Sequence, residues 1–193
     1  KKELEKKTIF VEQKMIKENV GSQDQIAATY GGFNKITFKK NGTFIVKPIS
    51  INKRTAKKLN RNLLLVYTGY KRTAHHIAKS YVNKLQTSKK EYVLKISKYV
   101  KKAEDALKKG QLDKFGKLLD DAWIEKKKLS ISITNPSIDK IYNKALKNGA
   151  LGGKLLGAGG GGFFIFYVPY PRQKKFVRRF KNFITIPFNF SAD

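Results

Sequence analysis

The chain has 193 residues, of which 40% are hydrophobic and 12% aromatic, and its formal net charge is +28. This apolar content excludes an intrinsically disordered chain, and no apolar run approaches the roughly 20 residues of a membrane-spanning helix. Cysteine is absent and no apolar signal segment follows Lys1, so we expect a cytoplasmic protein without a membrane partner.

The high positive charge raises the question of a polyanion partner. Of the 42 basic residues only six are arginine, and the lysines are spread over the whole chain. Because proteins that read nucleic acids usually depend on the planar fork of arginine, this distribution favours a lysine-rich surface over a nucleic-acid interface. We therefore expect no nucleic-acid partner, while the positive field would help to attract a phosphorylated substrate.

Two helices and a hairpin are predicted in the first part of the chain. Residues 1–17 fit a helix that has no capping residue before it, which is typical of a fragment of a longer protein. A second, short helix follows from a cap at Ser22 to Tyr30. Asn41-Gly42 then lies between two short apolar runs, a pattern that predicts a β-hairpin with a type I′ turn, in which both turn residues need a positive φ.

The rest of the chain alternates between strands and helices. The polar segment 52–62 marks a boundary between two lobes, which we place at residues 1–60 and 61–193. The order of elements is mixed α+β, without an internal repeat. The predicted elements are a strand over 63–67, a helix containing Ala74 to Val82, a helix from Tyr92 to Leu107 stopped by Gly110, a helix from Leu112 to Trp123, a helix begun by Asn135-Pro136, a strand over 163–168, a helix begun by Pro171 and a strand over 184–186.

Asp24 is the first candidate for a catalytic group. It falls in the predicted first turn of a short helix, after Gly21 and between the amides of Gln23 and Gln25. A helix N-terminus stabilises an ionised carboxylate, which is able to accept or orient a hydroxyl proton. On local physics alone, however, ordinary capping of the helix explains Asp24 better than catalysis does.

A glycine-rich segment from Gly152 to Gly162 is the second candidate, with seven glycines in eleven residues. It is not a Walker A loop, because it lacks the Gly-Lys-Ser/Thr ending and precedes a strand rather than a helix. Successive backbone N–H groups in such a loop form an anion nest, although a flexible linker has a similar composition. The apolar pairs Leu155-Leu156 and Phe163-Phe164 bracket the segment closely, which favours a functional loop tethered in a core.

The turn after the predicted strand 63–67 is the third candidate, since it places Thr68, Lys71 and Arg72 before a helix, as a phosphate site would. A routine connection with solvated basic residues explains this turn equally well. His75-His76 does not predict a metal site, because no third ligand has a useful spacing.

Three segments together resemble the motifs of the GHMP kinase superfamily, and most closely its heptose 7-phosphate kinase branch. Trp123 and Asn135-Pro136 also fall where that branch has them. The order and spacing of the motifs are specific, and the resemblance covers nearly the whole chain. The similar segments are 18–34, which matches the family's catalytic-aspartate segment, 65–74, which matches the strand and loop of the heptose branch, and 149–163, which matches the third family motif.

The resemblance implies a two-lobed α+β kinase, in which residues 1–60 are the remnant of an S5-like N-terminal lobe and residues 61–193 are a ferredoxin-like C-terminal lobe. Such a kinase uses ATP and Mg²⁺ to phosphorylate a sugar hydroxyl. In the heptose branch the product is heptose 1,7-bisphosphate, which leads to nucleotide-activated heptose and surface polysaccharide. The implied roles are general base for Asp24, substrate binding for Gly21, Ser22, Gln23, Lys71 and Arg72, and an active-site loop near the phosphates for Gly153, Gly157, Gly159, Gly160 and Gly161, with no metal ligand.

One departure from the family pattern concerns ATP. The Pro-x-x-x-Gly-Leu-Gly-Ser-Ser-type loop that holds the ATP phosphates, and the magnesium-binding acid with it, are absent from these 193 residues. We therefore expect an N-terminally truncated fragment that binds ATP weakly and does not turn over alone, with exposed sheet edges that favour a homodimer. A kinase of another sugar, of the fucose or galactose type, and a basic non-catalytic polyanion-binding protein stay open as alternatives.

Overall fold

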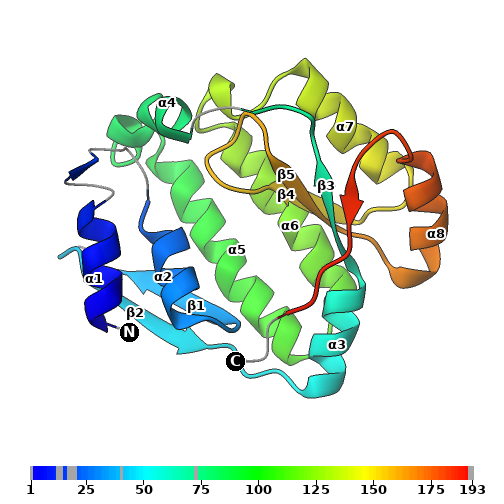
Figure 1. The fold of residues 1–193 in the computed structure, drawn as a ribbon, viewed down its shortest axis with the longest axis horizontal. Coiled ribbons are helices and arrows are strands. Elements are labelled where there is room, and N and C mark those ends of the chain that lie inside the picture. The colour runs from blue at the N-terminus through cyan, green and yellow to red at the C-terminus, as the bar shows by residue number, and fades with distance from the viewer. Residues whose placement is uncertain (1, 12–14, 17–20, 40, 72–73, 191–193) are drawn as a thin grey trace. The chain divides into compact units, whose positions relative to one another are not determined.

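The computed structural model describes residues 2–11, 15–16, 21–39, 41–71 and 74–190, and the chain forms two compact units (Figure 1). The first unit comprises residues 1–50 together with 189–193, and the second comprises residues 51–188. No helix among the described residues is both long and apolar enough to cross a membrane.

The first unit contains two helices and the predicted hairpin. Helix α1 spans Lys2–Phe10, and the predicted continuation to Lys17 falls largely outside the described residues. Helix α2 spans Gln23–Tyr30 and buries Ile26 completely. Strands β1 (Asn34–Phe38) and β2 (Phe44–Pro48) pair antiparallel, so the hairpin is confirmed.

The turn of this hairpin differs from the type I′ turn that the sequence predicts. The Lys39 N–H donates to the Thr43 carbonyl over 2.8 Å, which leaves three residues in the turn rather than two. The Gly42 N–H donates to the Lys39 carbonyl at 3.1 Å. The Asn41 side chain adds to the turn, since its Oδ1 accepts from the Thr43 N–H at 3.1 Å and from the Thr43 hydroxyl at 2.7 Å. Gly42 supplies a left-handed residue, at φ 78°. The Asn-Gly pair therefore marks the hairpin but not its turn type.

The second unit is built on a four-stranded antiparallel sheet. Strand β3 (Leu63–Tyr67) lies in the interior beside β5 (Phe163–Tyr167), and the spatial order is β4-β5-β3-β6. Strands β4 (Gly152–Leu155) and β6 (Thr185–Ile186) form the two edges. Along the chain, helices follow β3, β4 and β5 are consecutive, and another helix precedes β6. This βαββαβ arrangement is the ferredoxin-like topology, so the expected α+β fold is confirmed.

Helices cover this sheet, and most of them are where the sequence places them. The predicted boundary 52–62 is itself helical, because Asn52 caps a helix by accepting from the Thr55 N–H at 2.8 Å. The helix predicted through Val82 instead ends at Lys79 and is followed by a 3₁₀ turn. The helical elements are α3 (Lys53–Arg61), α4 (Ala74–Lys79), η2 (Val82–Lys84), α5 (Lys90–Lys108), α6 (Leu112–Lys127), η3 (Ile131–Ile133), α7 (Pro136–Lys147) and α8 (Tyr170–Arg179).

Aromatic side chains from the sheet and three helices form the core of the second unit. Phe164 and Phe166 of β5 are fully buried and stack with their ring centroids 5.0 Å apart. Trp123 of α6 meets Phe164 edge-on at 5.7 Å, while Phe176 of α8 lies 6.0 Å from Phe166. Tyr142 of α7 contacts both strand rings. Burying several such side chains provides most of the driving force that holds these helices on the sheet.

Two buried tyrosine hydroxyls tie this core to acidic groups on α6. Tyr142 donates to Asp120 Oδ1 at 2.5 Å, and Tyr167 donates to Asp113 Oδ1 at 2.9 Å. Burial, followed by the hydrogen bond to the carboxylate, raises the pKa of both Tyr142 and Tyr167 above the ordinary value. The folded state thus keeps both hydroxyls protonated at a pH where the unfolded chain ionises them.

This difference predicts a loss of stability at high pH. The two protonated hydroxyls contribute to the free energy of unfolding. This contribution is fully present below the unfolded tyrosine pKa of about 10 and declines as the pH rises beyond it. We expect the urea midpoint to fall above about pH 10, and to fall less steeply in a Tyr142→Phe/Tyr167→Phe double variant, although that variant is less stable at neutral pH. Equal slopes for the two proteins would contradict the assignment, because the lysines titrate in both.

Candidate active site

The glycine-rich loop, residues 157–162, connects β4 to β5 and is closed at its base by the Leu156 N–H, which donates to the Phe163 carbonyl over 2.9 Å (Figure 1). Four of its glycines have φ between 67° and 124°, a backbone that side-chain-bearing residues rarely adopt. The loop is packed as well as bent, since a Cβ on Gly161 would lie 2.5 Å from the Tyr70 carbonyl oxygen. These contacts are those of a tethered loop and not of a flexible linker.

The turn after β3 is hydrogen-bonded directly to the end of this loop. Thr68, which is 3% exposed, donates to the Gly162 carbonyl from both its N–H and its hydroxyl, each over 2.9 Å. In return the Gly162 N–H donates to the Tyr70 carbonyl at 2.9 Å. Two segments that are about ninety residues apart in the sequence therefore form one surface. Lys71 is exposed on it, whereas Arg72 lies outside the described residues.

Two further elements hold the loop, and sequence reasoning identified neither of them. The carbonyl of Ile133, in η3, accepts from the Gly160 N–H at 2.8 Å. The ammonium of Lys126, at the end of α6, donates to the Gly157 carbonyl at 2.5 Å and to the Leu155 carbonyl at 3.4 Å. Each anchor is separated from the loop by more than twenty residues of sequence, so only the tertiary structure identifies it.

The anchored loop presents backbone donors. Within the part of the chain that the structure describes, the N–H groups of Ala158, Gly159 and Gly161 have no hydrogen-bond acceptor. Gly159 is buried, and a buried N–H without a partner costs about as much as a lost hydrogen bond. Unpaired N–H groups on a strongly curved backbone form a concavity suited to an anion.

Gly153 has a different environment from the rest of the glycine set. It lies in strand β4, where a Cβ would be 2.4 Å from Phe166 Cδ1 and 2.6 Å from the Ile165 carbonyl oxygen. The Gly153 carbonyl accepts from the Tyr142 hydroxyl at 3.2 Å. Its missing side chain thus permits close packing within the sheet, outside the loop.

Asp24 belongs to the first unit, in the first turn of α2. Its side chain is exposed and makes no hydrogen bond or ion pair with the described residues. Ser22 occupies the N-cap position, but its side chain makes no capping bond. Gln23 is exposed, and a Cβ on Gly21 would meet open space. The carboxylate is therefore available to a ligand beside the positive end of the helix.

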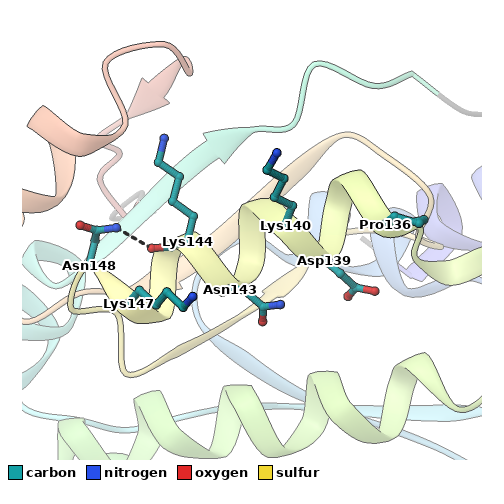
Figure 2. Close-up of a pocket in the computed structure, with 7 residues that line it drawn as sticks. All are labelled: Pro136, Asp139, Lys140, Asn143, Lys144, Lys147 and Asn148. Atoms are coloured by element: carbon teal, nitrogen blue, oxygen red, sulfur yellow. Dashed lines mark hydrogen bonds between the residues drawn. The ribbon is translucent and has the colours of Figure 1, made fainter.

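A surface depression of about 510 Å³ lies along the outer face of α7 (Figure 2). Lys140, Lys144 and Lys147 line it, and the Asn148 side chain donates to the Lys144 carbonyl at 2.8 Å. None of its lining residues belongs to the glycine-rich loop or to the turn after β3. All of its lining residues belong to α7 or its C-cap, so no second element faces a ligand there. We therefore assign the depression no part in the candidate site.

Comparison with known proteins shows similarity to kinases. Residues 103–183 match a sequence model of the family described as "GHMP kinases C terminal". A Campylobacter jejuni protein, D-glycero-alpha-D-manno-heptose 7-phosphate kinase, is 34% identical over 159 residues, which cover 82% of this chain and 47% of that protein. An Arabidopsis thaliana bifunctional fucokinase/GDP-fucose pyrophosphorylase is 27% identical over 177 residues, covering 89% of this chain and 17% of that protein.

A solved structure has the same fold over nearly the whole chain. It is a D-glycero-D-manno-heptose 1-phosphate kinase from Bacteroides thetaiotaomicron, with a TM-score of 0.73 and 28% identity over 98% of this chain and 52% of that chain. The chain thus spans about half the length of the heptose kinases that it matches.

Proposed function

Because the chain carries the C-terminal domain of the GHMP kinases, we propose that the protein is an ATP-dependent sugar kinase whose substrate is heptose 7-phosphate. The γ-phosphoryl group passes to the anomeric hydroxyl and the product is heptose 1,7-bisphosphate, which supplies nucleotide-activated heptose in the cytoplasm for surface polysaccharide. The observation that carries the proposal is the hydrogen-bonded surface formed by the glycine-rich loop and the turn after β3, in a chain that is 34% identical to a heptose 7-phosphate kinase.

In the proposed reaction the chain binds and orients the substrates more than it reacts with them. The N–H groups of the glycine-rich loop bind phosphate oxygens, and Lys71 with Arg72 binds the phosphate that the sugar already carries. Phosphoryl transfer depends mainly on such positioning and on positive potential. A cationic clamp of this kind also discriminates a phosphorylated sugar from a free one.

Asp24 is the proposed general base. Its carboxylate accepts the proton of the anomeric hydroxyl as that oxygen bonds to the γ-phosphorus and the bond to the ADP oxygen breaks. Gly21, Ser22 and Gln23 shape the substrate side of the same helix start. The carboxylate lies in the first turn of α2, beside the positive end of the helix.

Magnesium accompanies ATP in the proposed reaction, as the fold family implies. Among the described residues no group of three histidine or acidic side chains is arranged to hold a metal ion. We derive no step of the mechanism from the ion.

A kinase of another sugar is the second candidate. The resemblance to the Arabidopsis fucokinase covers 89% of this chain, which is more than the heptose kinase resemblance covers, although at lower identity. The names of the two heptose relatives also differ in which position of the sugar is already phosphorylated. We favour heptose 7-phosphate because that relative has the higher identity and because the turn after β3 is basic.

A substrate panel tests the proposal. The product of the complete reading frame would be incubated with Mg-ATP and, separately, heptose 7-phosphate, heptose 1-phosphate, fucose and galactose, with ADP release as the readout. We expect the highest kcat/KM with heptose 7-phosphate, and no turnover by the 193-residue chain alone, because the phosphate loop of the family is not among its residues. Preference for fucose would support the second candidate, and transfer to no sugar would overturn the proposed kinase function.

A further inference from the structure

Three consecutive lysines at the end of α6 have three different partners. Lys127 pairs with Asp139 at 3.1 Å, and Lys128 pairs with Glu125 at 2.7 Å. Lys126 alone of the three is directed at backbone, since its ammonium contacts the carbonyl oxygens of Gly157 and Leu155 where the chain enters the glycine-rich loop. A charge-assisted hydrogen bond of this kind is about twice as strong as a neutral one.

This contact fixes the orientation of a peptide group. In a planar trans peptide the carbonyl and the following N–H point in opposite directions, and the structure has no cis peptide among its described residues. The Gly157 carbonyl points to Lys126, so the Ala158 N–H points to the other side. That N–H is one of the donors that have no acceptor in the described chain.

The other anchors do not replace this contact. Ile133 holds Gly160 in the middle of the loop, and Thr68 with Tyr70 holds Gly162 at its end. Gly157 has φ 67°, and a Cβ there would meet nothing within 4 Å. Side-chain packing therefore does not hold Gly157 itself. The Leu156–Phe163 hydrogen bond closes the base of the loop, and Lys126 restrains the Gly157 carbonyl that follows it.

We propose that Lys126 is a positioning residue, which holds the Gly157–Ala158 peptide so that the Ala158 N–H faces the phosphate bound by the loop. This inference rests on the proposed function, because it assumes that the loop binds a phosphate group. Lys126 acts through the backbone and does not itself touch the phosphate. Loss of its ammonium leaves the fold intact and leaves the peptide free to rotate.

Amide NMR of the 193-residue chain, labelled with ¹⁵N-glycine and ¹⁵N-alanine, tests this inference with inorganic pyrophosphate as the probe, at physiological ionic strength. In the unaltered chain we expect pyrophosphate to shift the amide resonances of Ala158, Gly159 and Gly161, with those of Gly42 and Gly110 unmoved. Lys126→Met should weaken this binding about tenfold, the effect of losing one charge-assisted hydrogen bond.

Two control variants separate positioning from charge. Lys127→Met removes the same charge from the same helix and should change pyrophosphate affinity less than about twofold, because this partly exposed lysine pairs with Asp139, outside the loop. Lys126→Arg keeps a donor within reach and should restore most of the affinity. Lys126→Met should also shift the Ala158 amide without pyrophosphate, while the urea midpoint changes little.

The outcomes distinguish the inference from the proposed function. If pyrophosphate shifts the loop amides equally in the unaltered chain and in Lys126→Met, the positioning role is wrong and the phosphate-binding loop stands. If the Lys127→Met and Lys126→Met variants lose the same affinity, the effect is one of general charge and the positioning role is again wrong. If pyrophosphate shifts no loop amide in the unaltered chain, the proposed phosphate-binding function fails and the inference fails with it.

Discussion

Replacing Asp24 with asparagine is expected to lower kcat of the enzyme by about 10²–10⁴-fold, the usual contribution of a general base. Asparagine has the same shape but cannot take the proton of the sugar hydroxyl. The side chain is exposed and makes no hydrogen bond or ion pair with the described residues, so the free energy of unfolding should change little. The measurement is the steady-state rate with heptose 7-phosphate and Mg-ATP, using the product of the complete reading frame.

Asp139→Asn is the matched control, because Asp139 also lies in the first turn of a helix and its partner is a surface lysine. Its kcat should stay within about twofold of the unaltered enzyme, as expected when a partly exposed ion pair outside the loop is lost. A KM for heptose 7-phosphate that rises in Asp24→Asn while kcat is unchanged would show that Asp24 binds the sugar without acting as a base. Equal rates for Asp24→Asn and the unaltered enzyme would remove Asp24 from the site.

The second large effect concerns stability, at the contact of α6 with β4. A Cβ on Gly152 would lie 2.1 Å from the Gly116 carbonyl oxygen and 2.9 Å from the Asp120 backbone nitrogen. Both neighbours are backbone atoms of α6, so no side-chain rotation relieves the clash. Gly152→Val should therefore lower the free energy of unfolding by roughly 3 kcal/mol or more, at or above the upper end of ordinary overpacking. Urea denaturation followed by Trp123 fluorescence measures this loss.

Gly157→Ala is the control for Gly152→Val. Gly157 has open space around it but a φ of 67°, so alanine there costs only the strain of the left-handed conformation, about 1–2 kcal/mol. If Gly152→Val unfolds at the same urea concentration as the unaltered chain, α6 and β4 are farther apart than the structure places them.

Local sequence signals predicted the framework of the second unit well. Asn135 caps α7 by accepting from the Ile138 N–H at 3.0 Å, as its pairing with Pro136 indicates. The helices predicted from Tyr92 to Leu107 and from Leu112 to Trp123, and the strand 63–67, also match α5, α6 and β3 closely. Each is indicated by residues that are adjacent or only three or four apart in the chain.

Two local features were missed or misjudged, a helix and a turn. Helix α3 was predicted as a polar boundary because it buries only Leu59 among its residues, so its composition resembles that of a loop. The hairpin turn was misjudged because backbone bonds join Lys39 to both Gly42 and Thr43, which makes the loop one residue longer than a type I′ turn.

The candidate site was likewise predicted only in part. Glycine content and bracketing apolar residues were enough to predict a tethered loop at 157–162, and its junction with Thr68 brought two predicted segments together. Composition could not show that Gly153 packs inside the sheet and has a different role from the glycines of the loop. It also could not identify Lys126, which is one of many lysines until its ammonium is seen against two carbonyl oxygens.

The position of the transferred phosphate tests the central proposal most directly. Phosphorus NMR of the reaction of the complete-frame product with Mg-ATP and heptose 7-phosphate should show a new anomeric phosphate, coupled to the sugar H1, beside an unchanged 7-phosphate signal. The new signal should be missing with Asp24→Asn. A phosphate at any other position, or consumption of ATP without a new sugar phosphate, would contradict the proposed function.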